Sequence, residues 1–386
     1  MPLYNIFNNF KMITNDNLLS FFNKKKSINT FSQFLKMAQV KTSSQLIPLK
    51  TYIEKKNISI DVLKLLFENI QNRDDYLTRF YNTSLKYAED ISIVESPMKT
   101  KHFNNDLCVK YKNVIRNMFF WEILKNTKSG MTNNPSFMET IENLYNHWII
   151  DYKILTPSSI HYMKNGRLGS VFSSYFFRAS IMNPYLVFSL NESIFKAKRV
   201  FTPTLGWGSY YYGLAESGIT HYVGTDVIPR VCDTVRQFAK ERYPTIETTI
   251  FCLPSENLAK KMAFVNKYRG FFDLIFFSPP YYRLEMYEGN KQSTEQYPDY
   301  KDWLQNYWKK TIELCSRVIH PQGKLCYILS GYGSENTHGE YDLLKDMNNI
   351  TKKYFHLKET QSMYNKNVHV TKHRETGEKI MIFTLK

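Results

Sequence analysis

Residues 272–282 read Phe272-Asp-Leu-Ile-Phe-Phe-Ser278-Pro279-Pro280-Tyr281-Tyr282. The mostly apolar run before Ser278 is typical of a buried strand, and the two prolines end it. Proline fixes its own φ angle and has no N–H group, so we predict that the backbone carbonyls of Ser278 and Pro279 are held rigidly as acceptors. A polar side chain, fixed acceptors and a tyrosine ring form a socket suited to a flat, amine-bearing base. The alternative is a strand-terminating turn with no further role.

A second segment, upstream, reads Val200-Phe-Thr-Pro-Thr-Leu-Gly206-Trp-Gly208-Ser209. An apolar strand runs into a Gly-x-Gly turn and then a helix, and glycine lets the backbone approach a ligand because no Cβ intervenes. Alone the pattern is weak, since many such turns bind nothing. It gains weight from Asp226, which ends the next predicted strand and is placed to accept the ribose hydroxyls of a nucleoside cofactor. The alternative role of Asp226 is an N-cap for the helix that begins near Arg230. NAD is disfavoured because no third glycine follows at the dinucleotide spacing.

From about residue 156 the chain alternates short apolar runs with helical stretches, which indicates βαβ units around a parallel sheet. The predicted strands are 199–202, 221–226, 248–253, 272–277, 324–329, 355–360 and 379–385, and the predicted helices between them are 230–242, 255–267 and 302–319. We therefore predict a doubly wound α/β sheet, whose ligands bind at the carboxyl ends of the strands.

Residues 1–155 are predicted to be mainly helical. Amphipathic spacing covers 59–70 and 111–123, and Ser136-Phe-Met-Glu139 is a capping box that starts a further helix. We divide the chain into a mainly helical domain, 1–155, which is a candidate for nucleic-acid or partner contact, and an α/β domain, 156–386.

These features together resemble the S-adenosylmethionine-dependent amino-methyltransferases, which methylate N4 of cytosine or N6 of adenine in DNA. The resemblance covers about residues 165–386 and implies a Rossmann-like, seven-stranded methyltransferase sheet with S-adenosylmethionine as cofactor. The family's catalytic motif, Asp/Asn/Ser-Pro-Pro-Tyr/Phe/Trp, falls on Ser278, Pro279, Pro280 and Tyr281. A serine in the first position resembles the N4-cytosine branch more than the N6-adenine branch.

The resemblance also implies a set of cofactor-binding residues. The glycine turn binds the methionine part of the cofactor, and the acid after the second strand holds the ribose. Carried over to this chain, the set is Gly206, Gly208, Asp226 with its neighbour Val227, Glu256 as a substitute for the acid that holds the adenine amine, Thr202, and Asn183 in the segment 176–184 before the turn.

The chain departs from the family at the glycine turn. Thr202 and Leu205 stand where the family usually has Asp and Phe, so cofactor binding could be weakened and a catalytically silent, nucleic-acid-binding relative is an alternative. No separate recognition domain fits between the two motifs. We therefore expect the N-terminal domain and the 283–300 segment to contact the target. That polar segment is predicted to be a mobile loop over the site, with a solvated surface loop as the alternative.

Composition favours a nucleic-acid partner. The 386 residues include 51 Lys and Arg against 35 Asp and Glu, a net charge of +16, which suits a polyanion. DNA is the predicted substrate. RNA base-amine methylation is an alternative, and a small-molecule N-methyltransferase is a more distant one. Lys24-Lys25-Lys26 is a candidate phosphate contact or a solvated lysine run.

Five cysteines without a CxxC pair and nine histidines without HExxH give no support for a metal site or a disulfide framework. The sequence has no apolar run long enough to span a bilayer, so we expect a soluble, intracellular protein of the cytoplasm or nucleus, with a viral or phage origin as an alternative.

Overall fold

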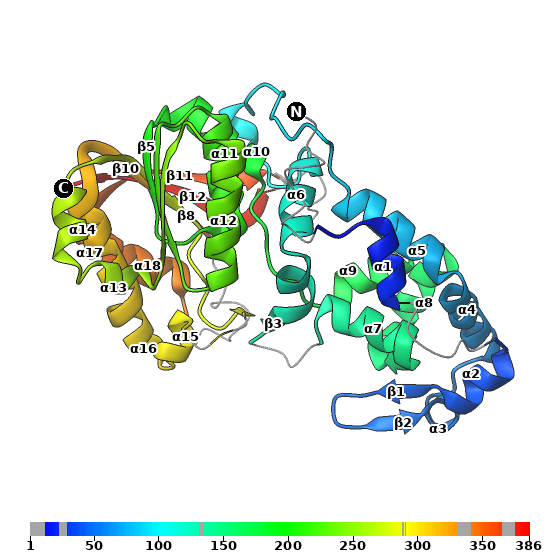
Figure 1. The fold of residues 1–386 in the computed structure, drawn as a ribbon. Coiled ribbons are helices and arrows are strands. Elements are labelled where there is room, and N and C mark those ends of the chain that lie inside the picture. Colours follow the sequence, from blue (N-terminus) through cyan, green and yellow to red (C-terminus); the bar gives the residue numbers. More distant parts are fainter. Residues whose placement is uncertain are drawn as a thin grey trace.

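In a computed structural model of the chain, the described residues are 12–22, 29–130, 135–287, 289, 291–330, 341–364 and 375–386. Figure 1 shows an α/β unit at one end of the molecule and a smaller, mainly helical unit at the other. The lysine run Lys24-Lys25-Lys26, a candidate phosphate contact, lies outside the described residues.

A seven-stranded sheet forms the centre of the α/β unit. Its order is β11-β12-β10-β8-β5-β6-β7. The bounds are β5 Arg199–Thr202, β6 His221–Asp226, β7 Glu247–Cys252, β8 Phe272–Phe277, β10 Ile319–Ser330, β11 Phe355–Tyr364 and β12 Glu375–Leu385. Neighbouring strands from β10 to β7 pair in parallel, whereas β12 runs antiparallel to both β10 and β11. This confirms the predicted α/β class and the predicted Rossmann-like sheet of seven strands.

Helices cover both faces of the sheet (Figure 1). One face carries α10 (Pro184–Leu190), α11 (Ser209–Glu216) and α12 (Pro229–Arg242), and the other carries α13 (Ser255–Leu258), α14 (Met262–Lys267), α17 (Lys309–Val318) and α18 (Leu343–Thr351). The chain order moves outward from β5 through β6 to β7, then returns to the other side of β5 with β8 and β10. This reversal between β5 and β8 creates the crevice in which ligands of such sheets bind.

The helical unit packs around its own buried apolar residues. Its helices are α1 Asn15–Phe22, α2 Phe31–Met37, α3 Leu49–Lys56, α4 Ile60–Gln71, α5 Arg73–Phe80, α7 Phe137–His147, α8 Pro157–Lys164 and α9 Leu168–Tyr175. Ser136 caps α7 through its side chain, as the capping box predicts. A small sheet of order β2-β1-β4 (Leu46–Pro48, Gln39–Lys41, Ile149–Asp151) was not predicted, because its three-residue strands show no period.

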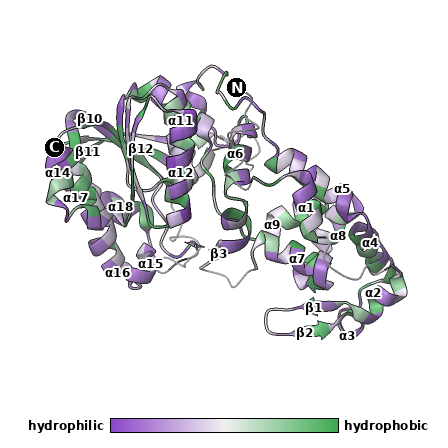
Figure 2. Ribbon diagram, viewed as in Figure 1, coloured by the Kyte–Doolittle hydropathy of each residue, from purple (hydrophilic) through white to green (hydrophobic). Residues whose placement is uncertain are grey.

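The interior of both units is apolar. Figure 2 shows hydrophobic residues along the central strands and on the inner faces of the helices, with hydrophilic residues on the outer faces. The largest fully buried side chains include Trp303, Trp308, Tyr211 and Tyr222. Burial of such large aromatic residues is the main favourable term that fixes the helices against the sheet.

Some helices of each unit lie on the other side of residue 155 in the sequence. The helices α8 and α9 follow residue 155 but pack on α4, α5 and α7, whereas α6 (Lys110–Met118) precedes it and packs on α10. Residues 90–98 hydrogen-bond to the α/β unit, for example from Tyr185 Oη to the Ser96 carbonyl. The division of the chain into two domains, 1–155 and 156–386, therefore stays a prediction.

Most predicted strands are confirmed. Strands β5, β6 and β8 have the predicted bounds, and β7 begins and ends one residue earlier than predicted. The predicted helix 255–267 is interrupted between α13 and α14, and 302–319 contains a π-helical turn at Leu304–Trp308 between two α-helices. Strand β10 contains an irregularity, because its pairing with β8 shifts register between Ile319 and Lys324.

Candidate active site

A cavity of about 390 Å³ opens at the carboxyl ends of β5, β6, β7 and β8. Its volume lies in the range of small-molecule and cofactor sites. Of the predicted site residues, the cavity wall includes Ser278, Pro279, Pro280, Tyr281, Gly206, Asp226, Val227 and Glu256. The structure therefore brings together residues from both motifs, more than 70 positions apart in the sequence, at the crevice where a ligand is expected.

Ser278 is held on three sides at the end of β8. Its backbone N–H donates to the hydroxyl of Tyr210 (3.0 Å), and its carbonyl accepts from that hydroxyl (3.4 Å) and from Thr204 Oγ1 (3.5 Å). Its side-chain Oγ lies 3.1 Å from the backbone carbonyl of Ile328 on β10. A carbonyl oxygen can only accept, so the single hydroxyl proton of Ser278 points at Ile328. Both lone pairs of Oγ are thereby left to accept from another group.

Pro279 and Tyr281 complete the socket. Pro279 is buried in the cavity wall, and no donor in the described part of the chain hydrogen-bonds to its backbone carbonyl. Tyr281 Oη accepts the backbone N–H of Ser330 at 2.8 Å, which fixes the ring at the cavity wall. Burial raises the pKa of Tyr281 above its usual value, so this phenol stays neutral. The predicted pairing of fixed acceptors with an aromatic face is present.

The glycine turn has a left-handed backbone throughout. Gly206, Trp207 and Gly208 have φ angles of 52°, 59° and 80°. A Cβ on Gly206 would lie 2.2 Å from Cζ of Tyr210, so this turn needs glycine for space as well as for conformation. Trp207 is not glycine, and its conformation is held by packing against Phe119, at 5.8 Å between ring centroids.

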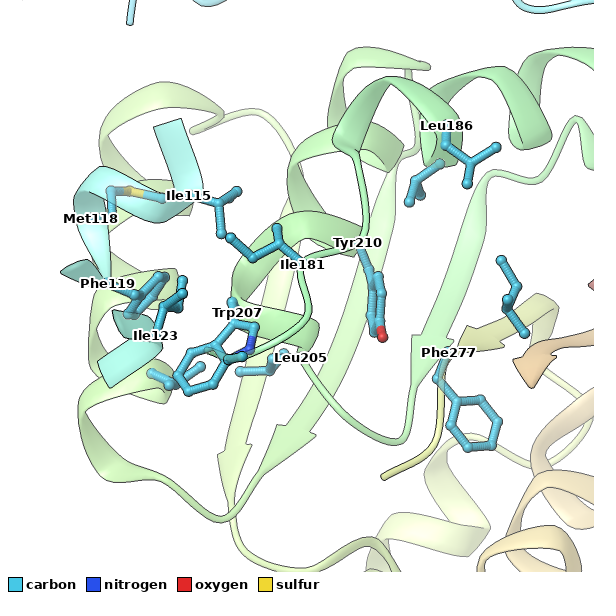
Figure 3. Close-up of a cluster of buried hydrophobic side chains, with 14 of the residues drawn as sticks. Ile115, Met118, Phe119, Ile123, Ile181, Leu186, Leu205, Trp207, Tyr210 and Phe277 are labelled. Atoms are coloured by element: carbon cyan, nitrogen blue, oxygen red, sulfur yellow. The ribbon is translucent and has the colours of Figure 1, made fainter. Parts of the chain in front are cut away.

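Figure 3 shows what supports this turn. Ile115, Met118, Phe119 and Ile123 of the N-terminal segment gather beside Trp207, Ile181 and Leu205, and Tyr210 stands between this cluster and the end of β8 at Phe277. All of these side chains are buried. The glycine turn is therefore wedged between the N-terminal segment and the sheet.

Asp226 ties two loops together. Its Oδ1 accepts the backbone N–H groups of Val227 (2.8 Å) and Ile228 (3.1 Å), and its Oδ2 accepts that of Leu205 (3.1 Å). A carboxylate has about four acceptor positions, so one remains, on Oδ2. Asp226 is not the N-cap of α12, which is Ile228. The structure leaves room for one further hydrogen bond to this carboxylate, fewer than the pair of ribose contacts expected from the sequence.

Three more acids line the cavity: Glu256, Glu285 and Glu378. Burial raises the pKa of each of them and of Asp226. Glu285 accepts the backbone N–H of Ser180 (3.0 Å) and the hydroxyl of Tyr287, whereas Oε1 of Glu256 is buried without a hydrogen-bond partner in the described chain. Four carboxyl groups face one cavity whose described lining contains a single lysine, Lys291, and no arginine. The cavity suits a cation with donor groups.

Three predicted cofactor residues do not line the cavity. Thr202 is fully buried, and its hydroxyl pairs with that of Tyr222 at 2.6 Å inside the sheet. Asn183 caps α10 and donates to the carbonyls of Asn105 and Leu107. Gly208 is the N-cap of α11 and packs toward Val235. Their roles in the structure are to shape the turn and its neighbours, which counts against direct contact with a cofactor.

Several wall residues carried no signal in the sequence. Tyr210 lies in the helix after the glycine turn among other tyrosines, and nothing in its spacing marks it. Ser180, Ile181 and Met182 fall in the loosely matched 176–184 segment and do line the cavity. Asn105 comes from the N-terminal half, where no site residue was predicted.

The 283–300 segment is not a solvated loop. Leu284, Glu285, Tyr287 and 291–294 line the cavity, and Gln292 and Thr294 are buried. Strand β9 (Glu285–Met286) pairs antiparallel with β3 (Lys128–Ser129), and the backbone of Gly130 passes so close to Arg283 that no side chain fits. That alternative is corrected: the described part of this segment forms one wall of the site, and its contact with a target stays a prediction.

A scan against family models and a search of curated proteins find no match for this sequence. Solved structures with a similar arrangement include the N-methyltransferase NodS from Bradyrhizobium japonicum WM9 (14% identity, 52% of this chain and 91% of that one, TM-score 0.34). TrmN from Thermus thermophilus matches at 13% identity over 53% and 49% of the two chains (TM-score 0.36). A TehB-like SAM-dependent methyltransferase from Corynebacterium glutamicum matches at 14% over 52% and 87% (TM-score 0.33). At these TM-scores the matches bear on neither substrate nor mechanism.

In the described part of the chain, no three His, Cys, Asp or Glu side chains gather as a metal site. The described helices include none with the length and apolar character needed to cross a membrane.

Proposed function

We propose that this protein transfers a methyl group from S-adenosylmethionine to the exocyclic amine of a base in DNA, with N4 of cytosine preferred over N6 of adenine. The observation that carries the proposal is the bond from Ser278 Oγ to the Ile328 carbonyl. It makes the hydroxyl of Ser278 an acceptor, beside the carbonyl of Pro279, and an exocyclic amine has two N–H groups to donate.

The residues of the socket would prepare this amine for reaction. Its lone pair is delocalised into the base ring, so it is a poor nucleophile. Hydrogen bonds to Ser278 Oγ and the Pro279 carbonyl draw the nitrogen out of conjugation and aim the lone pair. Tyr281, whose hydroxyl is fixed by Ser330, offers its ring as a stacking surface for the base. Catalysis is then mainly positioning, which a rigid socket supplies.

The acids of the cavity fit the proposed cofactor. S-adenosylmethionine, when bound, supplies a reactive methyl group on a positively charged sulfur. Glu256 would accept a hydrogen bond from an adenine amine, because its buried Oε1 has no partner in the described chain. Asp226 would take one ribose hydroxyl at its remaining Oδ2 position. Glu285 and Glu378 add negative charge to the same cavity, which favours a cation.

The substrate class rests on charge and on access. The net charge of +16 favours a polyanion over a small neutral substrate. The socket lies inside a cavity, so a base in a duplex would have to leave the stack to reach Ser278.

Mass analysis of nucleosides tests this proposal. DNA and matched RNA are incubated with the protein and S-adenosylmethionine, digested and analysed. We expect N4-methylcytosine from DNA, and its loss with Ser278→Ala. If the product is N6-methyladenine, the proposed mechanism stands and the proposed target base is wrong. If RNA is methylated and DNA is not, the proposed polymer is wrong.

If no methylated nucleoside forms and isothermal titration shows no binding of S-adenosylmethionine, the alternative of a catalytically silent, nucleic-acid-binding protein is favoured. The matched control is Ser316→Ala. Ser316 lies on α17, and its hydroxyl donates to the Glu313 carbonyl within that helix.

A further inference from the structure

Residues 99–109, which we call the rim segment, connect the cavity wall to the outer surface. Asn105 lines the cavity, whereas Leu107 and Val109 expose 45% and 44% of their surface. The chain therefore passes from the wall of the site to the solvent between Asn105 and Leu107. The rim segment leads into α6, which lies between the two units (Figure 1).

Hydrogen bonds and packing hold the rim segment in place. The side chain of Asn183, next to the cavity residue Met182, donates to the carbonyls of Asn105 (3.3 Å) and Leu107 (2.6 Å). Phe103 is fully buried, and its carbonyl accepts a backbone N–H group at the end of β11 (2.8 Å). The backbone that carries the exposed side chains is therefore fixed to the cavity wall and to the sheet.

Leu107 and Val109 are exposed together on this backbone. Single exposed apolar residues are ordinary on a protein surface. These two flank Cys108, whose φ angle of 53° is uncommon for a residue other than glycine. Such a conformation persists only where surrounding contacts impose it, and it is frequent where ligands bind. The turn presents two apolar side chains to the solvent in one fixed arrangement.

Two lysines of the rim segment have no partner for their charge. The nearby carboxylates, Glu95 and Asp106, each pair with a lysine of α6, at 2.7 Å and 2.9 Å. Lys99 and Lys101 are exposed, and in the described chain neither ammonium group has an ion pair or a hydrogen bond. The rim segment therefore offers positive charge together with apolar contacts. This combination suits a nucleic acid, whose phosphates are anionic and whose bases have apolar faces.

The position of the rim segment favours DNA over a protein as its partner. A base that enters the cavity brings the neighbouring nucleotides of its strand to the cavity entrance, and each carries a phosphodiester group. Extrusion of a base also opens the stack, and proteins that unstack DNA commonly insert apolar side chains such as leucine between base steps. The lysines and the two apolar residues match these two features of the strand.

We propose that the rim segment is a DNA-contact surface, in which Lys99 and Lys101 bind phosphates and Leu107 and Val109 pack against the bases that flank the target nucleotide. The inference rests on the proposed function insofar as the strand that enters the cavity is DNA. The phosphate contacts position the strand. The apolar contacts stabilise the state in which the target base has left the stack.

Binding of duplex DNA without cofactor tests this surface independently of methyl transfer. The first probe is a short, labelled duplex with a central cytosine–adenine mismatch, which lowers the free energy needed to extrude a base. The second is the fully paired duplex, and the third is an RNA duplex of the same sequence. Fluorescence anisotropy is measured with the full chain over a range of NaCl concentrations.

The two kinds of contact predict different results. Lys99→Gln combined with Lys101→Gln should weaken binding of both DNA duplexes and reduce the salt slope by about 0.9 for each lost phosphate contact. Leu107→Ser combined with Val109→Ser should weaken binding of the mismatched duplex about tenfold at every salt concentration, because an apolar contact releases no counterion. Its effect on the paired duplex should be smaller. All four side chains are exposed, so both variants should fold.

Matched controls lie away from the cavity. Lys352 and Lys353 are exposed just before β11, at the opposite end of that strand from Met363, which lines the cavity. Met262 is 56% exposed and begins α14, on the other face of the sheet from α10. Lys352→Gln combined with Lys353→Gln, and Met262→Ser, should bind both DNA duplexes like the wild type.

Wild-type affinity and salt slope in both rim-segment variants would overturn the DNA-contact surface and leave a protein as its partner. An equal loss of salt slope in the lysine control would also overturn it, because the effect would then come from overall charge. Tighter binding of the RNA duplex, weakened by the same variants, would overturn DNA as the ligand.

The outcome for the proposed function is separate. If the rim-segment variants lose DNA affinity as expected but the wild type methylates no base, the DNA-contact surface stands and the proposed function is rejected. If the wild type methylates DNA and both variants bind and methylate it equally well, the proposed function stands and the surface is rejected.

Discussion

The hydroxyl of Tyr210 lies 3.0 Å from the backbone nitrogen of Ser278. Tyr210 belongs to the helix that follows the glycine turn, and its ring covers Gly206, where a Cβ would collide with it. One tyrosine therefore connects the turn proposed to bind the cofactor with the motif proposed to bind the base. The geometry of each depends on the other through this side chain.

Tyr210→Phe should separate positioning from folding. It leaves the partly buried N–H of Ser278 without its hydrogen-bond partner, which should lower the free energy of unfolding by about 1 kcal/mol. We expect the rate of methyl transfer to fall by at least the factor that corresponds to this free energy, because the backbone of Ser278 is no longer held by Tyr210. Tyr211→Phe is the matched control, because Tyr211 is fully buried and bonded to Thr248, away from the socket. Urea unfolding and turnover are measured together. Equal turnover in the two variants would contradict the positioning role.

Gly206→Ala should lower the free energy of unfolding by more than the backbone angle of Gly206 explains. The φ angle of 52° alone penalises alanine by about 1 kcal/mol. The collision with Tyr210 adds to this and displaces Ser278. Gly166→Ala is the control, because Gly166 has φ of 67° and no atom within 4 Å of the point where a Cβ would lie. We expect a larger loss of stability for Gly206→Ala, and weaker S-adenosylmethionine binding in that variant alone by isothermal titration.

Tyr281→Ala removes the proposed stacking surface, which is worth about 1–3 kcal/mol per base. The loss should be partly rescued by a duplex whose target base is mismatched, because extruding that base costs less. Ser278→Ala should not be rescued, since its defect is in orienting the amine. Tyr281→Phe keeps the ring and loses the hydroxyl that accepts the N–H of Ser330, so it should retain most activity. Full turnover of both alanine variants on a paired duplex would reject base extrusion.

The affinity for a cationic cofactor should fall as the pH is lowered. Burial raises the pKa of Asp226, Glu256, Glu285 and Glu378, so these groups take up protons at a higher pH than exposed carboxyls, whose pKa is about 4. Protonation removes the negative charge that attracts the cation, so binding is strongest above the raised pKa values.

Calorimetry between about pH 5 and pH 8 checks this. S-adenosylhomocysteine, which lacks the sulfonium charge, is the control and should depend less on pH. The same groups favour the folded state in their protonated form, so their contribution to stability decreases as the pH rises through the raised pKa values. Equal pH dependence for both ligands would argue against a role for the carboxyl charges.

Asn117 should anchor the first described helix. Its side chain accepts the N–H of Ile13 (2.9 Å) and donates to the carbonyls of Ile13 (2.9 Å) and Leu85 (3.1 Å), all buried. Asn117→Leu leaves these backbone groups without partners and should destabilise the protein by more than about 2 kcal/mol. Hydrogen exchange should show faster exchange around residue 13. Unchanged exchange there would mean that packing alone holds α1.

The sequence predicted the sheet well because its strands are buried on both faces and end in Gly, Pro or Asp. Strands β5, β6 and β8 have such ends, and their bounds are confirmed. The sequence did not predict the roles of residues whose contacts are with residues far away in the chain. The hydroxyl of Thr202 pairs with Tyr222 in the next strand, and Tyr210 acquires its role only when β8 lies beside β5. Such pairings depend on tertiary packing, which local patterns do not contain.

The pairing of β3 with β9 has a consequence for any attempt to recombine this protein. Residues 128–129 belong to the N-terminal half, yet they form the second strand of the wall that contains Glu285. A chimera joined at residue 155 would replace the strand that pairs with this wall by a foreign backbone. Grafting a different specificity onto this α/β scaffold would therefore require residues from about 86 to 130 to travel with it, and the remaining helices form the exchangeable part.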